Sequence, residues 1–152
     1  MIEVERTATI AAPVDEVWDV VADPARAPDW YSFGDRVDVL SGDGVGEKRR
    51  QHGRYGMQRS EVDQEVVEFT PRKVVAWKET GERRDGKPAP RYSTSTVFRI
   101  ELSPFDDGTI VTLTSRQRPA GLVGAVVIRV LGARDIARRM EESLIRLARA
   151  IN

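Results

Sequence analysis

The stretch GLVGAVVIRVLGARDIARRMEESLIRLARAIN, residues 121–152, decides the fold of this chain. In its second part, apolar residues recur three or four positions apart, as one face of an α-helix requires; they are Ala133, Ile136, Met140, Leu144, Leu147 and Ile151. Its first part, residues 122–131, is apolar almost all round. The pattern predicts one long C-terminal helix whose two halves have different surfaces.

Upstream of this helix the sequence predicts strands and turns, apart from a helical region near the start. Pro13 suits the first turn of a short helix that ends at Asp23-Pro24, and residues 24–31 predict a second short helix. Residues 80–91 are polar and rich in Gly and Pro, which predicts a long mobile connection. Strands are expected at residues 2–10, around 37–39, and at 47–55, 57–69, 74–78, 94–102 and 110–115.

Length and composition narrow the class of protein. A chain of 152 residues is expected to form one domain, 1–152, with a real hydrophobic core. Lys plus Arg equal Asp plus Glu at 24 each, so no overall field favours a nucleic-acid partner. With no cysteine and only one histidine, we expect no metal site. No signal-peptide pattern opens the chain and no run is long enough to span a bilayer, so we expect a cytoplasmic protein.

Several segments, in their order and spacing, resemble the START-like superfamily (SRPBCC), and in particular its birch-pollen-allergen-like and polyketide cyclase/dehydrase-like branches. They are residues 11–18 (AAPVDEVW), 23–30 (DPARAPDW), 42–46 (GDGVG), 66–71 (VVEFTP) and 107–109 (DGT). The resemblance implies an α+β helix-grip fold, in which a seven-stranded curved antiparallel sheet wraps around a long C-terminal helix and two short helices lie between strands 1 and 2. It implies an apolar ligand cavity between sheet and helix. It implies neither a reaction nor a cofactor, and we expect no cofactor.

The charged strand at residues 47–55 has no apolar face on either side. An unpaired buried charge is very costly, so the strand either lies at a solvent edge or aims one arginine, Arg50 or Arg49, at an acidic group or a ligand. His52 is either an exposed strand residue or a general base, because its ordinary pKa is near neutrality. Arg50 and His52 are therefore candidate ligand-binding residues.

Neutral polar residues share faces with apolar ones on two predicted strands. Hydroxyls and amides are costly in a dry core, so these faces indicate either a cavity holding water or ligand, or a solvated strand end. Tryptophans are core anchors by default, and they are also good walls for an apolar ligand. The candidate ligand-binding residues are Trp30, Arg50, His52, Ser60, Gln64, Trp77, Thr96, Phe98, Met140 and Leu144.

Three functions follow as hypotheses. The first is binding of a hydrophobic small molecule, lipid-like or aromatic polyketide-like, in the cavity. The second is a cyclase or dehydratase in which His52, Arg50 or Tyr92 acts as the acid or base. The third is a regulatory or chaperone-like interaction protein. Residues 122–131 either pack inside or expose one face to a membrane surface or to a second subunit.

Overall fold

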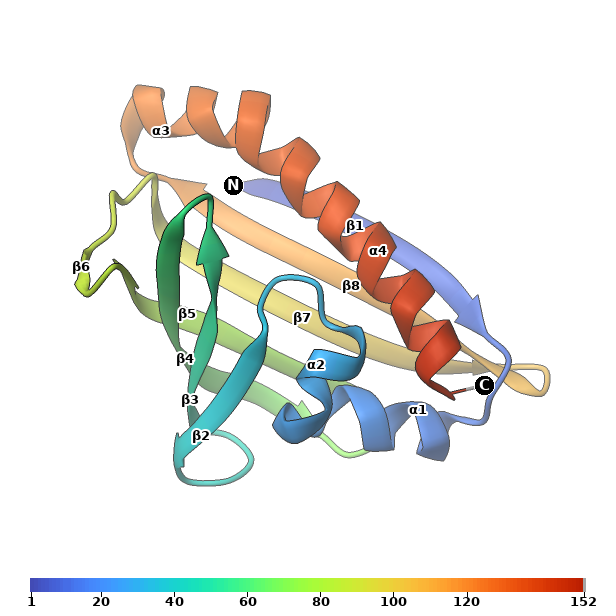
Figure 1. The fold of residues 1–152 in the computed structure, drawn as a ribbon. Helices are drawn as coiled ribbons and strands as arrows, with labels where there is room; N and C mark the ends of the chain where they lie inside the picture. The colour runs from blue at the N-terminus through green and yellow to red at the C-terminus, as the bar shows by residue number, and fades with distance from the viewer. Residues whose placement is uncertain (152) are drawn as a thin grey trace.

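A computed structural model describes residues 1–151 and shows an α+β fold, in which one curved antiparallel sheet faces a long helical segment (Figure 1). Seven strands follow the order β1-β8-β7-β5-β4-β3-β2, and a two-residue strand, β6, pairs with β5. The predicted seven-stranded helix-grip sheet is therefore confirmed, with one short strand added. The strands are β1 (Ile2–Ile10), β2 (Arg36–Ser41), β3 (Lys48–Tyr55), β4 (Gln58–Thr70), β5 (Val74–Arg84), β6 (Lys87–Pro88), β7 (Ser93–Phe105) and β8 (Gly108–Pro119).

Two short helices lie between β1 and β2, as predicted: α1 (Val14–Val21) and α2 (Ala27–Trp30), joined by a 3-10 turn at Pro24–Arg26. The Asp23 side chain caps that turn by accepting a hydrogen bond from the Ala25 N–H at 3.0 Å. The C-terminal segment comprises α3 (Gly121–Val127), a π-helical turn (Ile128–Gly132) and α4 (Ala133–Ile151). The long helix is thus confirmed with one irregular turn, and Asn152 lies outside the described residues.

The predicted apolar stripe of α4 is the face that packs on the sheet. Met140 and Leu147 are fully buried and Leu144 nearly so. They belong to the same core cluster as inward-facing strand residues such as Val75 and Ile100, which are also fully buried. Each such side chain contributes about 1.5–3 kcal/mol by leaving water. In Figure 1, α4 runs along the sheet with α3 at one end and α1 and α2 near the other.

An aromatic cluster fills the interior near α2. The Trp77 and Phe98 rings stack with centroids 5.2 Å apart, and Tyr31 meets both edge-on at 6.0 and 5.7 Å. The segment after α2 is tied to α4, since Ser32 Oγ donates to the Arg139 carbonyl at 2.6 Å. This part of the interior is solid, so an unfilled space must lie elsewhere.

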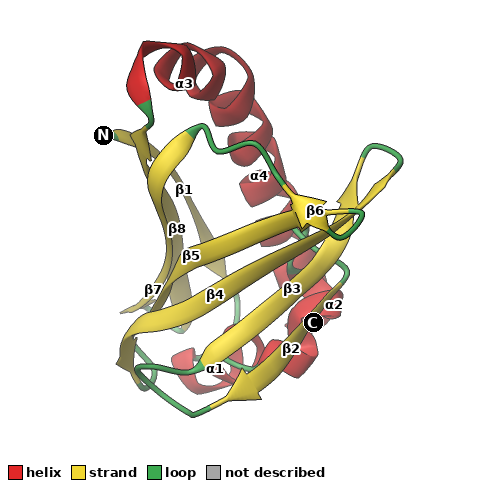
Figure 2. Cartoon of the chain, turned by 90° about the vertical axis from the view of Figure 1, so that its left-hand side faces the viewer, coloured by secondary structure: helices red, strands yellow, loops and turns green. Residues whose placement is uncertain are grey.

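The prediction of a long mobile connection at residues 80–91 was wrong. Strand β5 continues to Arg84 and turns back into β6 through Asp85 and Gly86, both with positive φ (51° and 80°). An Asp-Gly pair with two positive φ values suits the tight turn of a β-hairpin. Figure 2 shows β6 folded back at one end of β5. The extended β5 brings additional side chains to the inner face of the sheet.

Candidate ligand-binding cavity

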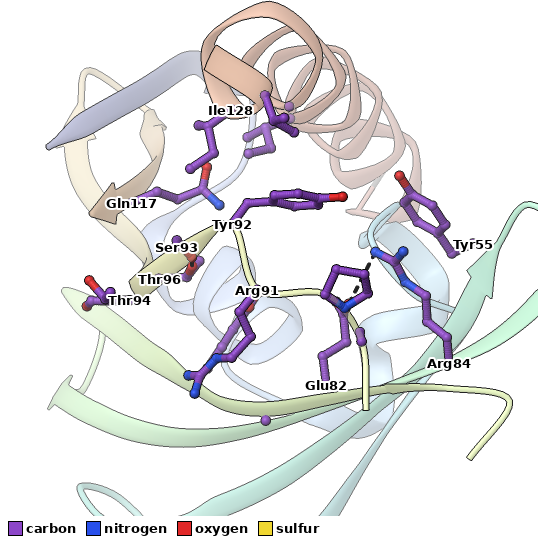
Figure 3. A pocket seen from close by; sticks show the side chains of 18 of the residues that line it. Tyr55, Glu82, Arg84, Arg91, Tyr92, Ser93, Thr94, Thr96, Gln117 and Ile128 are labelled. Carbon is purple, nitrogen blue, oxygen red and sulfur yellow. Dashed lines mark hydrogen bonds and ion pairs between the residues drawn. The ribbon is translucent and has the colours of Figure 1, made fainter. Parts of the chain in front are cut away.

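A cavity of about 770 Å³ lies at the α3 end of the molecule. Its walls come from the distal half of β5, the start of β7, the connection between β6 and β7, and the helical segment from α3 to α4 (Figure 3). It lies between the sheet and the helical segment. The aromatic cluster separates it from α1. The fold therefore places open space where the C-terminal segment is least regular.

The helical wall of the cavity is mostly apolar, with Asp135 as its charged side chain. Val127, Ile128, Leu131 and Ile136 line it. Three of the four belong to the π-helical turn or border it, and such turns are frequent at functional sites. This side of the cavity therefore presents mainly hydrocarbon surface.

Helix α3 is held over the cavity by a close backbone approach at Gly124. A methyl group at this position would overlap the Tyr92 carbonyl oxygen, so only glycine fits. The same carbonyl accepts a hydrogen bond from the Ala120 N–H at 2.9 Å. Tyr92 thus anchors α3 through its backbone, while its ring lies across the cavity (Figure 3).

The strand wall is polar. Thr96 lies beside Ser93, with the two hydroxyl oxygens 2.8 Å apart, and Gln117 of β8 lines the same side. Further along, the Arg84 guanidinium lies 3.7 Å above the Tyr55 ring and forms a 3.3 Å ion pair with Glu82. Figure 3 shows Arg84 and Tyr55 pointing toward each other at the side of the cavity. The cavity therefore combines one apolar wall with several fixed polar groups, as ligand sites usually do.

Among the carboxyl groups that line the cavity, Glu79 has the pKa that burial raises most clearly. It follows Val75 and Trp77 at the strand period of two, so it lies on the inner face of β5. Its side chain lines the cavity and keeps part of its surface exposed to solvent. Removal from bulk water, followed by repulsion from Glu82, raises the pKa of Glu79 from 4.5 to about 7. The negative charge of Glu79 in turn adds to the effect of burial in raising the pKa of Tyr31.

Of the ten ligand-binding residues predicted from the sequence, Thr96 lines this cavity. Trp30, Gln64 and Trp77 instead border a void of about 20 Å³, too small for an organic ligand. Phe98 packs on Trp77, and Met140 and Leu144 lie in the core on the buried face of α4. Ser60 is half-buried on the inner face of β4, opposite Arg84.

Arg50 and His52 lie on the outer face of the sheet. Arg50 donates to Asp63 at 2.8 Å, and His52 lies 2.9 Å from Asp38. A hydrogen bond from Arg83, with a second from Arg50, holds the pKa of Asp63 down at about 2 although burial opposes this. Their positions give no support to a role in ligand binding, which stays a prediction.

The inward-facing arginine of β3 is Arg49, the alternative left open by the sequence. Only 5% of its side chain is exposed, and its Nε donates to Glu47 at 2.5 Å. Its guanidinium also lies 5.6 Å from the centre of the Trp77 ring. Arg49 is thus satisfied by the protein itself and is not free for a ligand.

Sequence reasoning missed Glu79, Glu82 and Arg84. The interpretation of residues 80–91 as a mobile connection ended β5 too early. For Glu79 a usable signal existed, since the alternation Val75, Trp77, Glu79 continues one inner face. For Glu82 and Arg84 no such signal existed, because a bulge changes the alternation between them and Glu79.

Solved structures of other proteins share this fold. TTHA0849 from Thermus thermophilus matches with a TM-score of 0.76 at 15% identity, covering 99% of this chain and 97% of that one. Ara h 8.0201 matches with a TM-score of 0.75 at 13% identity, with the same coverages of 99% and 97%. DynU16, from the dynemicin biosynthetic locus, matches at 0.66 and 22% identity over 97% of this chain and 46% of its own. A comparison with curated proteins gave no match.

A curved antiparallel sheet closed by a long C-terminal helix, with a cavity between them, defines a protein of the helix-grip class. Within that class, the family described as polyketide cyclase/dehydrase and lipid transport matches residues 1–152, and the chain belongs to it. The resemblance drawn from the sequence is confirmed. Within residues 1–151, no helix is both long and apolar enough to cross a bilayer.

Proposed function

We propose that this protein binds a hydrophobic small molecule, lipid-like or aromatic polyketide-like, in the cavity between β5, β7 and the C-terminal segment. The observation that carries the proposal is a space of about 770 Å³ with an apolar helical wall facing polar strand residues. Cavities of roughly 300–1,000 Å³ with this mixture of groups are typical of small-molecule sites. Burial of apolar ligand surface supplies the affinity, and the polar wall sets the orientation. A cytoplasmic location stays a prediction.

A pair of variants on one strand tests this proposal. Thr96 lines the cavity, whereas its neighbour Val97 points to the opposite face of β7, so Thr96→Phe places an aromatic ring in the space and Val97→Phe adds the same ring outside it. Native mass spectrometry of freshly purified protein is expected to show a bound small molecule in the wild type and in Val97→Phe, and clearly less of it in Thr96→Phe. A wild type without any bound molecule, or equal loading of the two variants, contradicts the proposal.

A second candidate is an enzyme of the cyclase or dehydratase kind that uses the same cavity. It is favoured by one observation, namely that Tyr92 and Glu79, two groups able to transfer protons, both line the space. The other acid/base candidates, His52 and Arg50, lie on the outer face. Turnover of a poly-β-ketone thioester, followed by mass spectrometry, is expected to be lost in Tyr92→Phe and retained in an outer-face variant, His52→Gln. Equal turnover in both variants contradicts this candidate.

We also propose that residues 122–131 contact an anionic membrane surface. Leu122, Val123, Val126 and Val130 are exposed by 88%, 74%, 60% and 58%. The other side of the same segment, at Val127 and Ile128, lines the cavity, so a bilayer docked here lies next to the ligand space. No Asp or Glu occurs from residue 108 to residue 134, while three exposed arginines flank the apolar surface: Arg118, Arg129 and Arg134.

Vesicle sedimentation tests the membrane contact. The protein is expected to sediment with phosphatidylcholine vesicles that contain about 30% phosphatidylserine and much less with phosphatidylcholine alone. The double change Leu122→Ser and Val126→Ser removes the effect, whereas Ile145→Ser, at an exposed apolar position of α4, leaves it unchanged. Sedimentation that is unaffected by the double change contradicts the proposal. A dimer in solution that the same double change dissociates assigns the surface to a second copy of the chain instead.

A further inference from the structure

A β-bulge in β5 places three charged residues on the cavity side of one strand. Glu79 lies opposite Gln64 of β4, but the next pair along the register joins Gly81 to Asp63, so Thr80 is one residue too many. Beyond the bulge, Glu82 lies opposite the buried Val62. Without the additional residue, Glu82 and Arg84 would face outward. The local backbone thus brings Glu79, Glu82 and Arg84 to one wall.

Two of these three residues form an ion pair with each other, and the third, Glu79, has no such partner within the described residues. Glu82 and Arg84 form an ion pair at 3.3 Å. Among the ion pairs of residues 1–151, none includes Glu79. Surrounding protein atoms replace part of the water around its carboxyl group, and its neighbour Glu82 repels its charge, so that its pKa is raised to about 7. Near neutral pH, Glu79 is therefore divided between a carboxylate and an uncharged acid.

A ligand in the cavity changes this balance in one direction. An apolar molecule against Val127, Ile128 and Leu131 displaces the water that solvates the Glu79 carboxylate. Loss of that water disfavours the charged form, so a filled cavity favours the uncharged acid. An uncharged carboxylic acid donates one O–H hydrogen bond. The natural partner of such a donor in a largely apolar molecule is a carbonyl oxygen.

We propose that Glu79 determines the specificity of the cavity by donating a hydrogen bond, as an uncharged acid, to a carbonyl oxygen of a neutral and largely apolar ligand. This inference rests on the proposed ligand-binding function and names the chemical class of the ligand. Ligand binding then takes up a proton. A ligand carboxylate would meet repulsion from Glu82 and from the ionised form of Glu79, and is disfavoured.

Several charged groups near Glu79 have ion-pair partners of their own. Arg84 is paired with Glu82, and Arg139 with Asp135 at 2.9 Å. Burial raises the pKa of Tyr31 and keeps its hydroxyl protonated. The titratable and charged groups around Glu79, from every element that borders this region, are Glu82 and Arg84 of β5, Arg49 and Tyr55 of β3, Tyr31 after α2, Arg91 and Tyr92 before β7, and Asp135 and Arg139 of α4.

Binding of a neutral fluorescent ketone at two pH values tests the inference. The probe is 6-propionyl-2-dimethylaminonaphthalene, whose emission reports both burial and hydrogen bonding to its carbonyl group. If only the uncharged acid binds, wild-type affinity is expected to be about tenfold weaker at pH 8 than at pH 6. Glu79→Gln keeps a neutral hydrogen-bond donor and is expected to bind equally at both pH values. Glu61→Gln, on the outer face of β4, is the matched control and is expected to behave as the wild type.

The possible results distinguish the role of Glu79 from ligand binding as such. Wild-type affinity that is equal at both pH values, or tighter at pH 8, overturns the role of Glu79 and leaves ligand binding in place. A pH dependence that persists in Glu79→Gln also overturns it. Failure of the probe to bind any variant at either pH removes the proposed ligand binding and the inference with it. The expected tenfold loss, abolished only in Glu79→Gln, supports both.

Discussion

Replacing Glu79 with Gln is expected to stabilise the protein at alkaline pH and to change little at acid pH. The raised pKa means that the folded protein binds the Glu79 proton more tightly than the unfolded chain does. Stability is therefore lost as the pH rises from the unfolded value of 4.5 through the folded value of about 7. Glutamine has nearly the same shape as the uncharged acid and never ionises, so the variant avoids that loss.

The magnitude of this stabilisation follows from the two pKa values. Since a tenfold change in proton affinity is worth about 1.4 kcal/mol, a rise from 4.5 to about 7 sets an upper limit of about 3 kcal/mol at pH 8. The side chain faces the cavity, where water still screens it, so we expect about 1 kcal/mol. For a chain of this length that corresponds to a melting temperature about 2–4 °C higher.

Thermal unfolding of wild type, Glu79→Gln and Glu61→Gln at pH 5 and pH 8 measures this effect. We expect Glu79→Gln to melt above the wild type at pH 8 and close to it at pH 5. The control Glu61→Gln removes a carboxylate that lies 3.8 Å from both Arg50 and Arg83, and it is expected to give no such gain. A Glu79→Gln variant that melts below the wild type at pH 8, or by the same margin at both pH values, would refute the reasoning.

Three further changes have defined outcomes. Gly124→Ala places a methyl group against the Tyr92 carbonyl, so we expect a loss of about 1–3 kcal/mol and faster hydrogen exchange in residues 89–93 and 121–127, against unchanged exchange in α4. Met140→Ala leaves a cavity at a fully buried position on the inner face of α4 and is expected to cost about 2–5 kcal/mol in urea unfolding. A loss below about 1 kcal/mol would contradict close packing of Met140 in the core. Asp63→Asn weakens the hydrogen bonds from Arg83 and is expected to cost about 1–2 kcal/mol above pH 4. The wild type loses this contribution itself as the pH falls from 3.8 through about 2, so the stabilities of the two proteins are expected to become equal there. Acid titration of both proteins, followed by circular dichroism, measures this.

Much of the fold was predictable because it follows from local periodicity. The three-to-four spacing of Met140, Leu144 and Leu147 identified the buried face of α4, and all three lie in the core. The alternation on β7 likewise placed Thr96 and Phe98 on the inner face. Such patterns need only the geometry of one helix or one strand, and the sequence contains that information directly.

The location of the candidate site was much less predictable. Trp30, Gln64 and Trp77 are buried, but they border a nearly filled part of the interior. Whether an inward side chain meets a cavity or another side chain depends on packing between segments far apart in the chain. Here Tyr31 and Phe98 close the space beside Trp77, and the larger cavity opens only toward α3.

The sequence by itself determined the α+β class, the long C-terminal helix and the face of that helix that packs on the sheet, because these follow from hydrophobic periodicity along the chain. Only the tertiary structure decided that Glu79, Glu82 and Arg84 share one wall and that the wall borders open space. The physical reason is that a single additional residue, Thr80, reverses the orientation of every side chain that follows it in the strand. The pairing of β4 with β5 determines where such a bulge occurs. The sequence of one strand alone therefore does not predict it.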